Sequence, residues 1–340
     1  MVSRAALVAA ALCVLFMGAT RAAATEGGWR RAPSPISLMI ASVKPAVEPS
    51  MPLAASRRAF LFGLAGVALT SGARAASASS AAQRIAAIEA AAGGRLGVAV
   101  VDADGATLIA HRAGERFAMC STFKALAVAA ALKRVDAGLD GLDRKIAYGP
   151  ADLLDYAPVA KAHVGEGAMS LAEVCAAALQ WSDNTAANLL LRAIGGPPAV
   201  TEFARALGDL TTRLDRDEPT LNAAVPGDPR DTTTPAAMAA NLRALALGDT
   251  LSPASRRQLE AWMAGDRVGD KRLRAGLPPD WGIADKTGTG DHGATNAIAI
   301  LRPPARPPLF AAVYYAESDR TMDERNAVHR DVAKAIVETL

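Results

Sequence analysis

Short apolar runs bounded by turn-forming residues lie near both ends of the folded part of this chain. Leu96 to Val101 and Ala106 to His111 flank residues 102–105, and Asn296 to Leu301 and Leu309 to Tyr315 flank a proline-rich loop. Apolar runs of four to eight residues between turn signals are typical of strands. The pattern therefore predicts one pair of strands early in the chain and a second pair late in it.

Between the two strand pairs, the pattern of apolar residues is mostly helical. The Ala/Leu-rich run Ala125 to Leu132 and the apolar run Leu171 to Leu179 predict buried helices. Two further helices are predicted outside this stretch. One spans Ala82 to Ala92 and is ended by two glycines, and the other begins at about Met322.

The composition indicates how large the hydrophobic core is and which kinds of binding partner the charge favours. The chain has 340 residues, of which 51% are hydrophobic, which is enough for one large globular domain or two. The formal charge of +3 is concentrated at the N-terminus: residues 1–75 hold eight of the 37 basic and two of the 34 acidic residues, so the remainder is slightly acidic. No basic stripe interleaved with aromatic residues is present, and we expect no nucleic-acid binding.

The first 75 residues carry targeting information rather than fold. Ser56-Arg57-Arg58-Ala59-Phe60-Leu61-Phe62 precedes an apolar run, and Ala73-Arg74-Ala75 offers small residues for cleavage. This pattern predicts a twin-arginine export signal over about 51–75, with the twin-arginine export machinery as a partner. We therefore expect a periplasmic or secreted protein.

An earlier apolar run, Ala5 to Ala19, has two interpretations. It is shorter than the roughly 20 residues that a membrane-spanning helix needs, although a short anchor is possible. Two tandem signal-type segments would be unusual. We therefore expect translation to begin at Met51, with residues 1–50 outside the native protein.

Ser121 and Lys124 stand three residues apart at the start of the first buried helix. This spacing places a hydroxyl and an amine on one helical face. A desolvated lysine can become the base that activates a serine, and backbone N–H groups at a helix N-terminus favour the negative charge that forms when serine attacks a carbonyl. Taken alone, the pair is more typical of a capping serine and a solvated lysine.

Three further motifs follow in a fixed order: Ser182-Asp183-Asn184, then Glu218-Pro219-Thr220-Leu221-Asn222, then Lys286-Thr287-Gly288 after the strand-like Trp281 to Ala284. Together with Ser-x-x-Lys they match the signature of penicillin-recognising serine enzymes. From about Ile85 to its C-terminus, the chain resembles a class A serine β-lactamase.

The resemblance implies a fold of the α/β class, of the α+β type. An antiparallel sheet flanked by helices would be formed by residues of about 76–118 and 268–340, and an inserted all-α domain by about 119–267. The active site would lie in the cleft between them, within a catalytic region spanning 76–340.

The resemblance also assigns chemistry to the motifs. Ser121 would be the nucleophile that opens the β-lactam ring, and Ser182 would relay a proton to the departing nitrogen. Glu218 would activate the water that hydrolyses the acyl-enzyme, with Asn222 helping to hold that water. Lys124 and Glu218 both remain candidates for the base of the first step.

The remaining implied positions bind substrate. The backbone N–H groups of Ser121 and Thr289 would form an oxyanion hole, and Lys286 would attract the substrate carboxylate. The full set of expected substrate-binding residues is Tyr156, Asn184, Asn222, Arg272, Lys286, Thr287 and Thr289.

One position departs from the family pattern. Many relatives carry an arginine where this chain has Thr295, and a threonine cannot contact a carboxylate ionically. Arg272 stands where other relatives place a substitute arginine, and we predict that it takes this role. The alternative is that it belongs to an exposed basic run with Lys271 and Arg274. Arg216 and Asp231 match the ion pair that closes the family's Ω-shaped loop around Glu218.

The cysteines and histidines argue against disulfide bonds and against a metal site. Cys120 and Cys175 lack the partners with which relatives form disulfides, because Val128 and Gly290 occupy those positions, so both thiols are predicted to be buried and free. The four histidines have no metal-ligand spacing, which argues against a zinc β-lactamase and against any cofactor. They are His111, His163, His292 and His329.

Two alternatives remain beside the predicted monomeric enzyme that hydrolyses penicillins and early cephalosporins. A DD-peptidase of the penicillin-binding class shares three of the four motifs, but Glu218 with Asn222 favours the lactamase. A non-catalytic β-lactam sensor would not need every catalytic position to be filled. The absence of a partner for Cys120 argues against strong carbapenem hydrolysis.

Overall fold

A five-stranded antiparallel sheet lies at the centre of the computed structural model, which describes residues 80–340. The strand order is β2-β1-β9-β8-β7, so β7 lies at one edge. The predicted export signal and start site lie outside the described residues. The strands are β1 (Arg95–Val101), β2 (Thr107–His111), β7 (Gly282–Thr289), β8 (Thr295–Arg302) and β9 (Leu309–Ala316).

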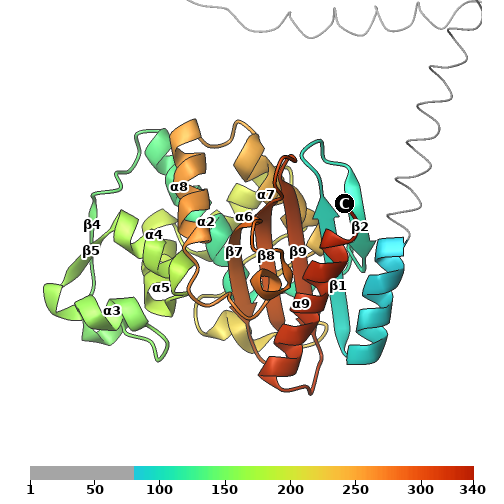
Figure 1. The fold of residues 1–340 in the computed structure, drawn as a ribbon. Coiled ribbons are helices and arrows are strands. Elements are labelled where there is room, and N and C mark those ends of the chain that lie inside the picture. The colour runs from blue at the N-terminus through green and yellow to red at the C-terminus, as the bar shows by residue number, and fades with distance from the viewer. Residues whose placement is uncertain (1–79) are drawn as a thin grey trace, which may run out of the picture. The chain divides into compact units, whose positions relative to one another are not determined.

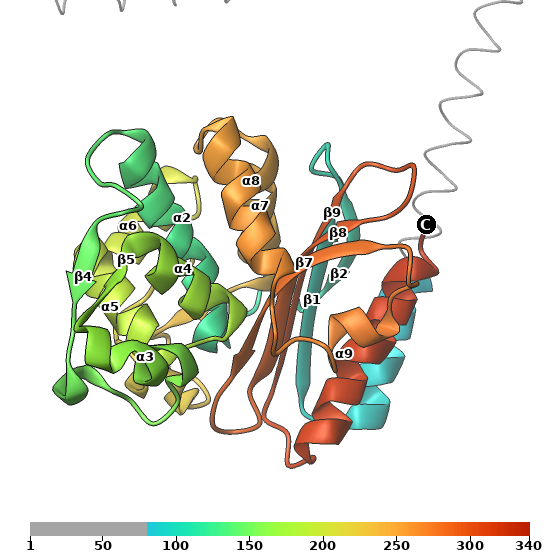
Figure 2. The same cartoon turned by 60° about the vertical axis from the view of Figure 1, so that its left-hand side comes forward.

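Helices cover both faces of this sheet (Figures 1 and 2). The helix at residues 80–92 and α9 (Met322–Val337) lie on one face, and α7 (Pro235–Leu247) and α8 (Pro253–Ala264) on the other. The remaining helices lie beyond α7 and α8 as seen from the sheet. They are α2 (Phe123–Asp136), α3 (Pro158–His163), α4 (Leu171–Gln180), α5 (Asn184–Ile194) and α6 (Pro197–Ala206).

The central strands contain continuous apolar runs, and both of their faces are buried. In β8, Ala297 and Ala299 pack in the cluster that contains the apolar side of α9, while the alternating Ile298 and Ile300 pack in the larger cluster that contains α2 and α7. Successive side chains of a strand point to opposite faces. A strand buried on both sides therefore has a continuous apolar run rather than an alternating one.

Two short antiparallel ladders lie outside the main sheet. β3 (Phe117–Ala118) pairs with β6 (Thr232–Thr233), and β4 (Lys145–Ala147) pairs with β5 (Ala168–Ser170). The first of these ladders lies directly before the Ser-x-x-Lys motif.

The sequence predicted the main elements correctly. The four terminal strands, the buried helices now seen as α2 and α4, and the C-terminal helix are each confirmed to within a few residues. Lys286, Thr287 and Thr289 were expected on a strand at the edge of the cleft, and they lie on the edge strand β7 together with most of the strand-like run Trp281 to Ala284. The α/β fold class with an antiparallel sheet and a mostly helical insertion is also confirmed. The domain boundaries remain a prediction.

None of the helices in residues 80–340 combines the length and the apolar character needed to cross a membrane.

Candidate active site

Ser121 lies in a 3-10 turn, Cys120–Thr122, that leads directly into α2. Its side chain is nearly buried, and its Oγ lies 3.2 Å from Glu218 Oε1, to which it donates a hydrogen bond. The preceding residue, Cys120, has a φ of +45°, a left-handed conformation that is uncommon outside glycine. Such backbone outliers occur at functional sites, where the surrounding structure holds them.

Lys124 is buried in the first turn of α2, and its ammonium group has three acceptors. Nζ donates to the backbone oxygen of Ser182 at 2.8 Å and to Asn184 Oδ1 at 2.7 Å, and it forms an ion pair with Glu218 Oε1 at 2.9 Å. Burial lowers the pKa of Lys124 below its ordinary value, while the carboxylate of Glu218 opposes that shift. Ser121 and Lys124 thus converge on the same carboxylate oxygen.

Glu218 is held at both its side chain and its backbone. Asn222 Nδ2 donates to Oε2 of the carboxylate. Asn188 of α5 accepts from the Glu218 N–H at 2.9 Å and donates to its carbonyl oxygen at 2.8 Å. We did not single out Asn188 from the sequence, although its position four residues after Asn184 places both on one face of α5.

The loop that carries Glu218 is closed by the predicted ion pair. Arg216 Nε contacts Asp231 Oδ2 at 2.6 Å, and Asp231 Oδ1 accepts from the backbone N–H groups of Asp215 and Arg216. Asp231 is fully buried. The expected Arg216–Asp231 contact is confirmed.

The Ser-Asp-Asn motif divides its roles among its three residues. Asp183, not Ser182, is the N-cap of α5: its Oδ1 accepts from the Ala186 N–H, and its Oδ2 accepts from two N–H groups of α3. Ser182 has a φ of +56° and lies with its hydroxyl beside Lys286. Asp183 therefore has a structural role at the start of α5, which leaves the Ser182 hydroxyl free to contact Lys286.

Lys286 projects from β7 and is fully buried. Its Nζ donates to Ser182 Oγ at 3.0 Å and to the carbonyl oxygen of Thr287 at 2.9 Å. Burial, opposed by the charge of Asp266, lowers the pKa of Lys286 to about 7.

Gly288 permits the close approach of β7 to the nucleophile. A Cβ added there would lie 2.8 Å from the carbonyl oxygen of Met119 and 3.2 Å from the backbone nitrogen of Ser121. Only glycine leaves room for this contact between the edge strand and the turn that carries Ser121.

Arg272 is buried and lines the cleft, so the alternative of an exposed basic run is wrong, while its role toward a substrate carboxylate stays a prediction. Nη1 donates to the carbonyl oxygens of Gly288 and Asn296, and Nη2 donates to Thr289 Oγ1 at 2.6 Å. Asn326 of α9 accepts from Nε. Burial lowers the pKa of Arg272 to about 10. Thr295 lies buried on β8, opposite Thr289 of β7.

A cleft of about 350 Å³ brings together the predicted substrate-binding residues other than Lys286. Lys124, Glu218 and Lys286 lie beneath its surface rather than in its lining. The lining consists of Ser121, Tyr156, Ser182, Asn184, Asn222, Val268, Arg272, Thr287, Gly288 and Thr289.

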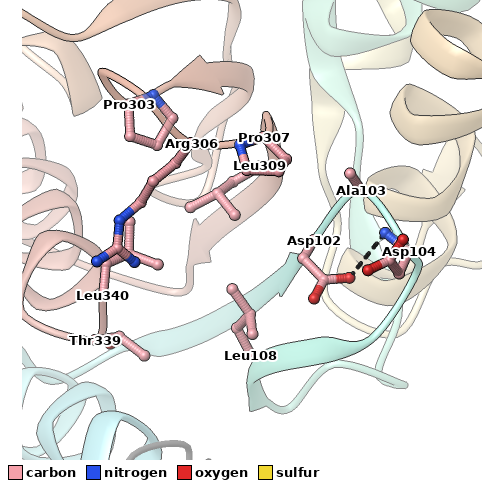
Figure 3. A pocket seen from close by; sticks show the side chains of 10 residues that line it. All are labelled: Asp102, Ala103, Asp104, Leu108, Pro303, Arg306, Pro307, Leu309, Thr339 and Leu340. Carbon is pink, nitrogen blue, oxygen red and sulfur yellow. Dashed lines mark hydrogen bonds between the residues drawn. The ribbon is translucent and has the colours of Figure 1, made fainter.

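A second hollow of about 490 Å³ lies away from this cleft, between the β1–β2 turn, the β8–β9 loop and the C-terminal residues (Figure 3). The carboxylate of Asp102 accepts from the backbone N–H of Asp104 there, which closes the predicted turn. Its lining includes none of the motif residues.

Cys120 and Cys175 are both buried and free, as predicted. Burial raises the pKa of the Cys120 thiol to about 12. A Cβ added to Gly290 would lie 2.7 Å from Cys120 Sγ, so the two positions are adjacent even though no disulfide can form. Within residues 80–340, no cluster of histidine, cysteine and acidic side chains is suitable for a metal ion.

The fold and this arrangement define a serine enzyme with its site in a cleft beside an antiparallel sheet. The chain belongs to the β-lactamase enzyme family, whose model matches residues 80–340. Beta-lactamase CTX-M-8 of Citrobacter amalonaticus is 50% identical over 257 residues, which cover 75% of this chain and 88% of that protein. Beta-lactamase Toho-1 of Escherichia coli is 48% identical over 261 residues, covering 77% and 89%.

Solved structures agree with this membership. An ancestral class A β-lactamase matches with a TM-score of 0.75 and 59% identity, covering 76% of this chain and all of that one. The putative class A β-lactamase PenP of Rhodopseudomonas palustris matches with a TM-score of 0.75 and 52% identity, covering 77% and 100%. The chain is therefore a class A serine β-lactamase by family.

Proposed function

We propose that the protein hydrolyses the β-lactam ring of penicillins and cephalosporins through an acyl-enzyme on Ser121, and so confers β-lactam resistance. The observation that carries this proposal is the convergence of Ser121 Oγ and Lys124 Nζ on Glu218 Oε1. A hydroxyl, a buried cation and a carboxylate in direct contact form an activated nucleophile.

Glu218 is the base of the acylation step. Three acceptors surround Lys124 Nζ, an environment that suits the protonated ammonium, and an ammonium has no lone pair with which to take a proton. Glu218 Oε1 accepts directly from Ser121 Oγ, and the proton moves to that oxygen as the serine attacks the ring carbonyl. The ring C–N bond then breaks, and Ser182 gives its proton to the departing nitrogen while Lys286 donates a hydrogen bond to the Ser182 oxygen. The proton taken up by Glu218 passes through Lys124, which lies between Glu218 and Ser182, and replaces the proton that Ser182 gave up, so that Glu218 is ionised again.

In deacylation, Glu218 acts together with Asn222, which contacts the second carboxylate oxygen, Oε2. Asn222 Oδ1 is buried with no hydrogen-bond partner among the described residues, while its Nδ2 donates to Glu218 Oε2. A water that donates to Asn222 Oδ1 and to Glu218 would lie beside the acyl ester of Ser121. Glu218 then removes a proton from this water as its oxygen attacks the ester.

The substrate carboxylate is attracted by a concentration of buried positive charge. Lys286 and Arg272 lie at the β7 side of the cleft, and Thr287 and Thr289 offer hydroxyls between them. Asn184 is positioned for the amide carbonyl of the substrate side chain, and Tyr156 lies at the cleft wall. The backbone N–H groups of Ser121 and Thr289 would stabilise the oxyanion.

Glu218 separates this function from that of a DD-peptidase. A penicillin-binding enzyme acylates but releases its product very slowly, whereas a carboxylate and an amide fixed beside the ester supply a path for water. The Asn188 bonds to the Glu218 backbone and the Arg216–Asp231 pair fix that carboxylate. Among substrates, we propose penicillins and early cephalosporins rather than carbapenems, with the protein acting as a monomer.

Two variants test the proposal with nitrocefin and benzylpenicillin. Ser121→Ala should abolish hydrolysis, because no other group can form the acyl-enzyme. Glu218→Ala should still acylate but release product very slowly, and mass spectrometry should show a persistent adduct on Ser121. Glu202→Ala, at an exposed glutamate of α6, is the matched control. Hydrolysis by Ser121→Ala would refute the assignment.

We further propose that the protein acts after export through the twin-arginine route. Support comes from the Arg57-Arg58 pair before an apolar run. Replacing both arginines by lysine should leave the precursor in the cytoplasm, as fractionation would show. N-terminal sequencing of the precursor tests the proposed start at Met51.

A further inference from the structure

Behind Lys286, two carboxylates from different parts of the chain are buried together. Asp266 lies just after α8, and Asp285 precedes Lys286 on β7. Asp266 is 5% exposed and Asp285 is fully buried. The chemistry described above uses neither of them.

Each carboxylate has one oxygen with a donor and one without. Asp266 Oδ1 accepts from the Val268 N–H at 2.9 Å, and Asp285 Oδ1 accepts from Arg274 Nη2. The Oδ2 atom of each is buried and has no hydrogen-bond partner in residues 80–340. Burying a charged oxygen without a hydrogen-bond donor costs free energy of folding. We therefore expect both Oδ2 atoms to have a hydrogen bond that involves a hydrogen atom between them.

The two orphaned oxygens lie on either side of Gly269. A Cβ added to Gly269 would lie 2.3 Å from Asp285 Oδ2 and 2.6 Å from Asp266 Oδ2. The oxygens cannot be farther apart than those two distances together. The lack of a side chain at Gly269 therefore leaves the two carboxylates facing the same small space.

The nearby cations do not occupy that space. Lys286, Arg272 and Arg274 are the positive groups that face the pair, and Asp270 lies beyond Arg274. The Lys286 ammonium donates to Ser182 Oγ and the Thr287 carbonyl oxygen. Arg272 donates to Asn326, Thr289 and two backbone carbonyls of β7 and β8. Arg274 reaches only the Oδ1 atom of Asp285.

We propose that Asp266 and Asp285 hold one proton between their Oδ2 atoms, so that the pair carries a single negative charge and positions the ammonium of Lys286 against Ser182. One shared proton gives both orphaned oxygens a hydrogen bond and removes the repulsion between two carboxylates in a buried site. The importance of this positioning for hydrolysis rests on the proposed function.

The local electrostatics agree with a shared proton. Burial, and next the charge of Asp266, raise the pKa of Asp285 to about 7, and burial also raises the pKa of Asp266. The proton therefore belongs to the pair rather than to one residue.

Carbon-13 NMR of protein labelled at its aspartate carboxyl carbons tests the proton directly. At about pH 6, we expect one aspartate carboxyl carbon to have the chemical shift of a protonated carboxyl group. If the proton exchanges rapidly between Asp266 and Asp285, both carbons should have shifts between those of the protonated and the ionised forms. Asp266→Asn should remove this signal, because its amide N–H then donates to an ionised Asp285. A wild-type spectrum in which every aspartate is fully ionised between about pH 5 and pH 7 would overturn the proposal. This measurement does not depend on β-lactam hydrolysis.

Kinetics test the positioning role. Asp266→Asn imitates the protonated partner, whereas Asp266→Ala leaves Asp285 Oδ2 without a donor. We expect kcat/KM in Asp266→Asn to exceed that in Asp266→Ala by about tenfold or more. Asp270→Asn, at an exposed carboxylate that pairs with Arg274, is the matched control and should match the wild type. Equal losses in the two Asp266 variants would mean that the charge of Asp266 is required and would contradict a shared proton.

Discussion

At the scale of single residues, burial decides what each charged side chain can do. Lys271, Arg272 and Arg274 are close neighbours in the sequence, yet they have three different environments. Lys271 is exposed and pairs with Asp323, Arg272 is buried at the cleft, and Arg274 reaches Asp285. A basic run in the sequence does not distinguish these cases, because the sequence alone does not show which side chain points inward.

Arg272 provides the first prediction at this scale. Arg272→Ala should lower kcat/KM for penicillins by about tenfold to a hundredfold, since a charged hydrogen bond is worth about 1.5 to 3 kcal/mol. The second N–H of its Nη2 has no acceptor in residues 80–340 and is available to a substrate carboxylate. Adding Thr295→Arg should partly restore activity, because Thr295 lies across from Thr289 on the neighbouring strand.

Lys271→Ala is the matched control for Arg272→Ala, because it removes a neighbouring positive charge that is exposed. Steady-state kinetics with benzylpenicillin compares the two. Unchanged kinetics in Arg272→Ala would show that the arginine serves only the contacts between β7, β8 and α9.

At the scale of elements, one buried ion pair fixes the loop on which Glu218 lies. Asp231 receives Arg216 and two backbone N–H groups, and its own N–H donates to Asp215. The loop therefore depends on a carboxylate that lies outside the catalytic cleft.

Asp231→Ala should lower the free energy of unfolding by about 3 kcal/mol, because it leaves the partly buried Arg216 and the backbone N–H groups unpaired. Deacylation should slow as well, since Glu218 loses its fixed position. Urea unfolding and the rate of release from the acyl-enzyme measure the two effects. Arg192→Ala removes an exposed pair with Asp152 and should cost about 0 to 1 kcal/mol. A loss in Asp231→Ala no larger than in this control would contradict the role of the pair.

At the scale of the whole molecule, a buried histidine links α9 to the sheet and makes stability depend on pH. His329 is fully buried, and its Nε2 lies 2.8 Å from the carbonyl oxygen of Thr295. Burial and the charge of Arg272 lower the pKa of His329 from 6.5 to about 3. Below pH 6.5 the unfolded chain therefore binds a proton that the folded protein does not.

It follows that the stability associated with neutral His329 is complete above about pH 6.5 and is lost as the pH falls towards 3. Between pH 7 and about pH 4.5, this group should cost about 2 to 3 kcal/mol, at 1.36 kcal/mol per pKa unit. The difference in unfolding free energy between wild type and His329→Asn should therefore be larger at pH 7 than at pH 4.5. Urea unfolding at both pH values measures it, with His163→Asn, at an exposed histidine, as control. A difference that is the same at both pH values would exclude this histidine as the cause.

The sequence by itself determined the elements and the identity of the motif residues, because both depend on local pattern. The spacing of Ser121 and Lys124 placed both at the start of the buried helix, where Ser121 lies in the 3-10 turn that leads into α2, and the apolar runs located the sheet and the buried helices. Only the tertiary structure decided that Arg272 lies at the cleft, that Asn188 holds the Glu218 backbone, and that Asp266 faces Asp285. These residues are distant in sequence from their partners. The charge state and pKa of a side chain, and its access to substrate, depend on the residues that pack around it. That packing forms only in the folded protein, where β7 contacts the turn that carries Ser121.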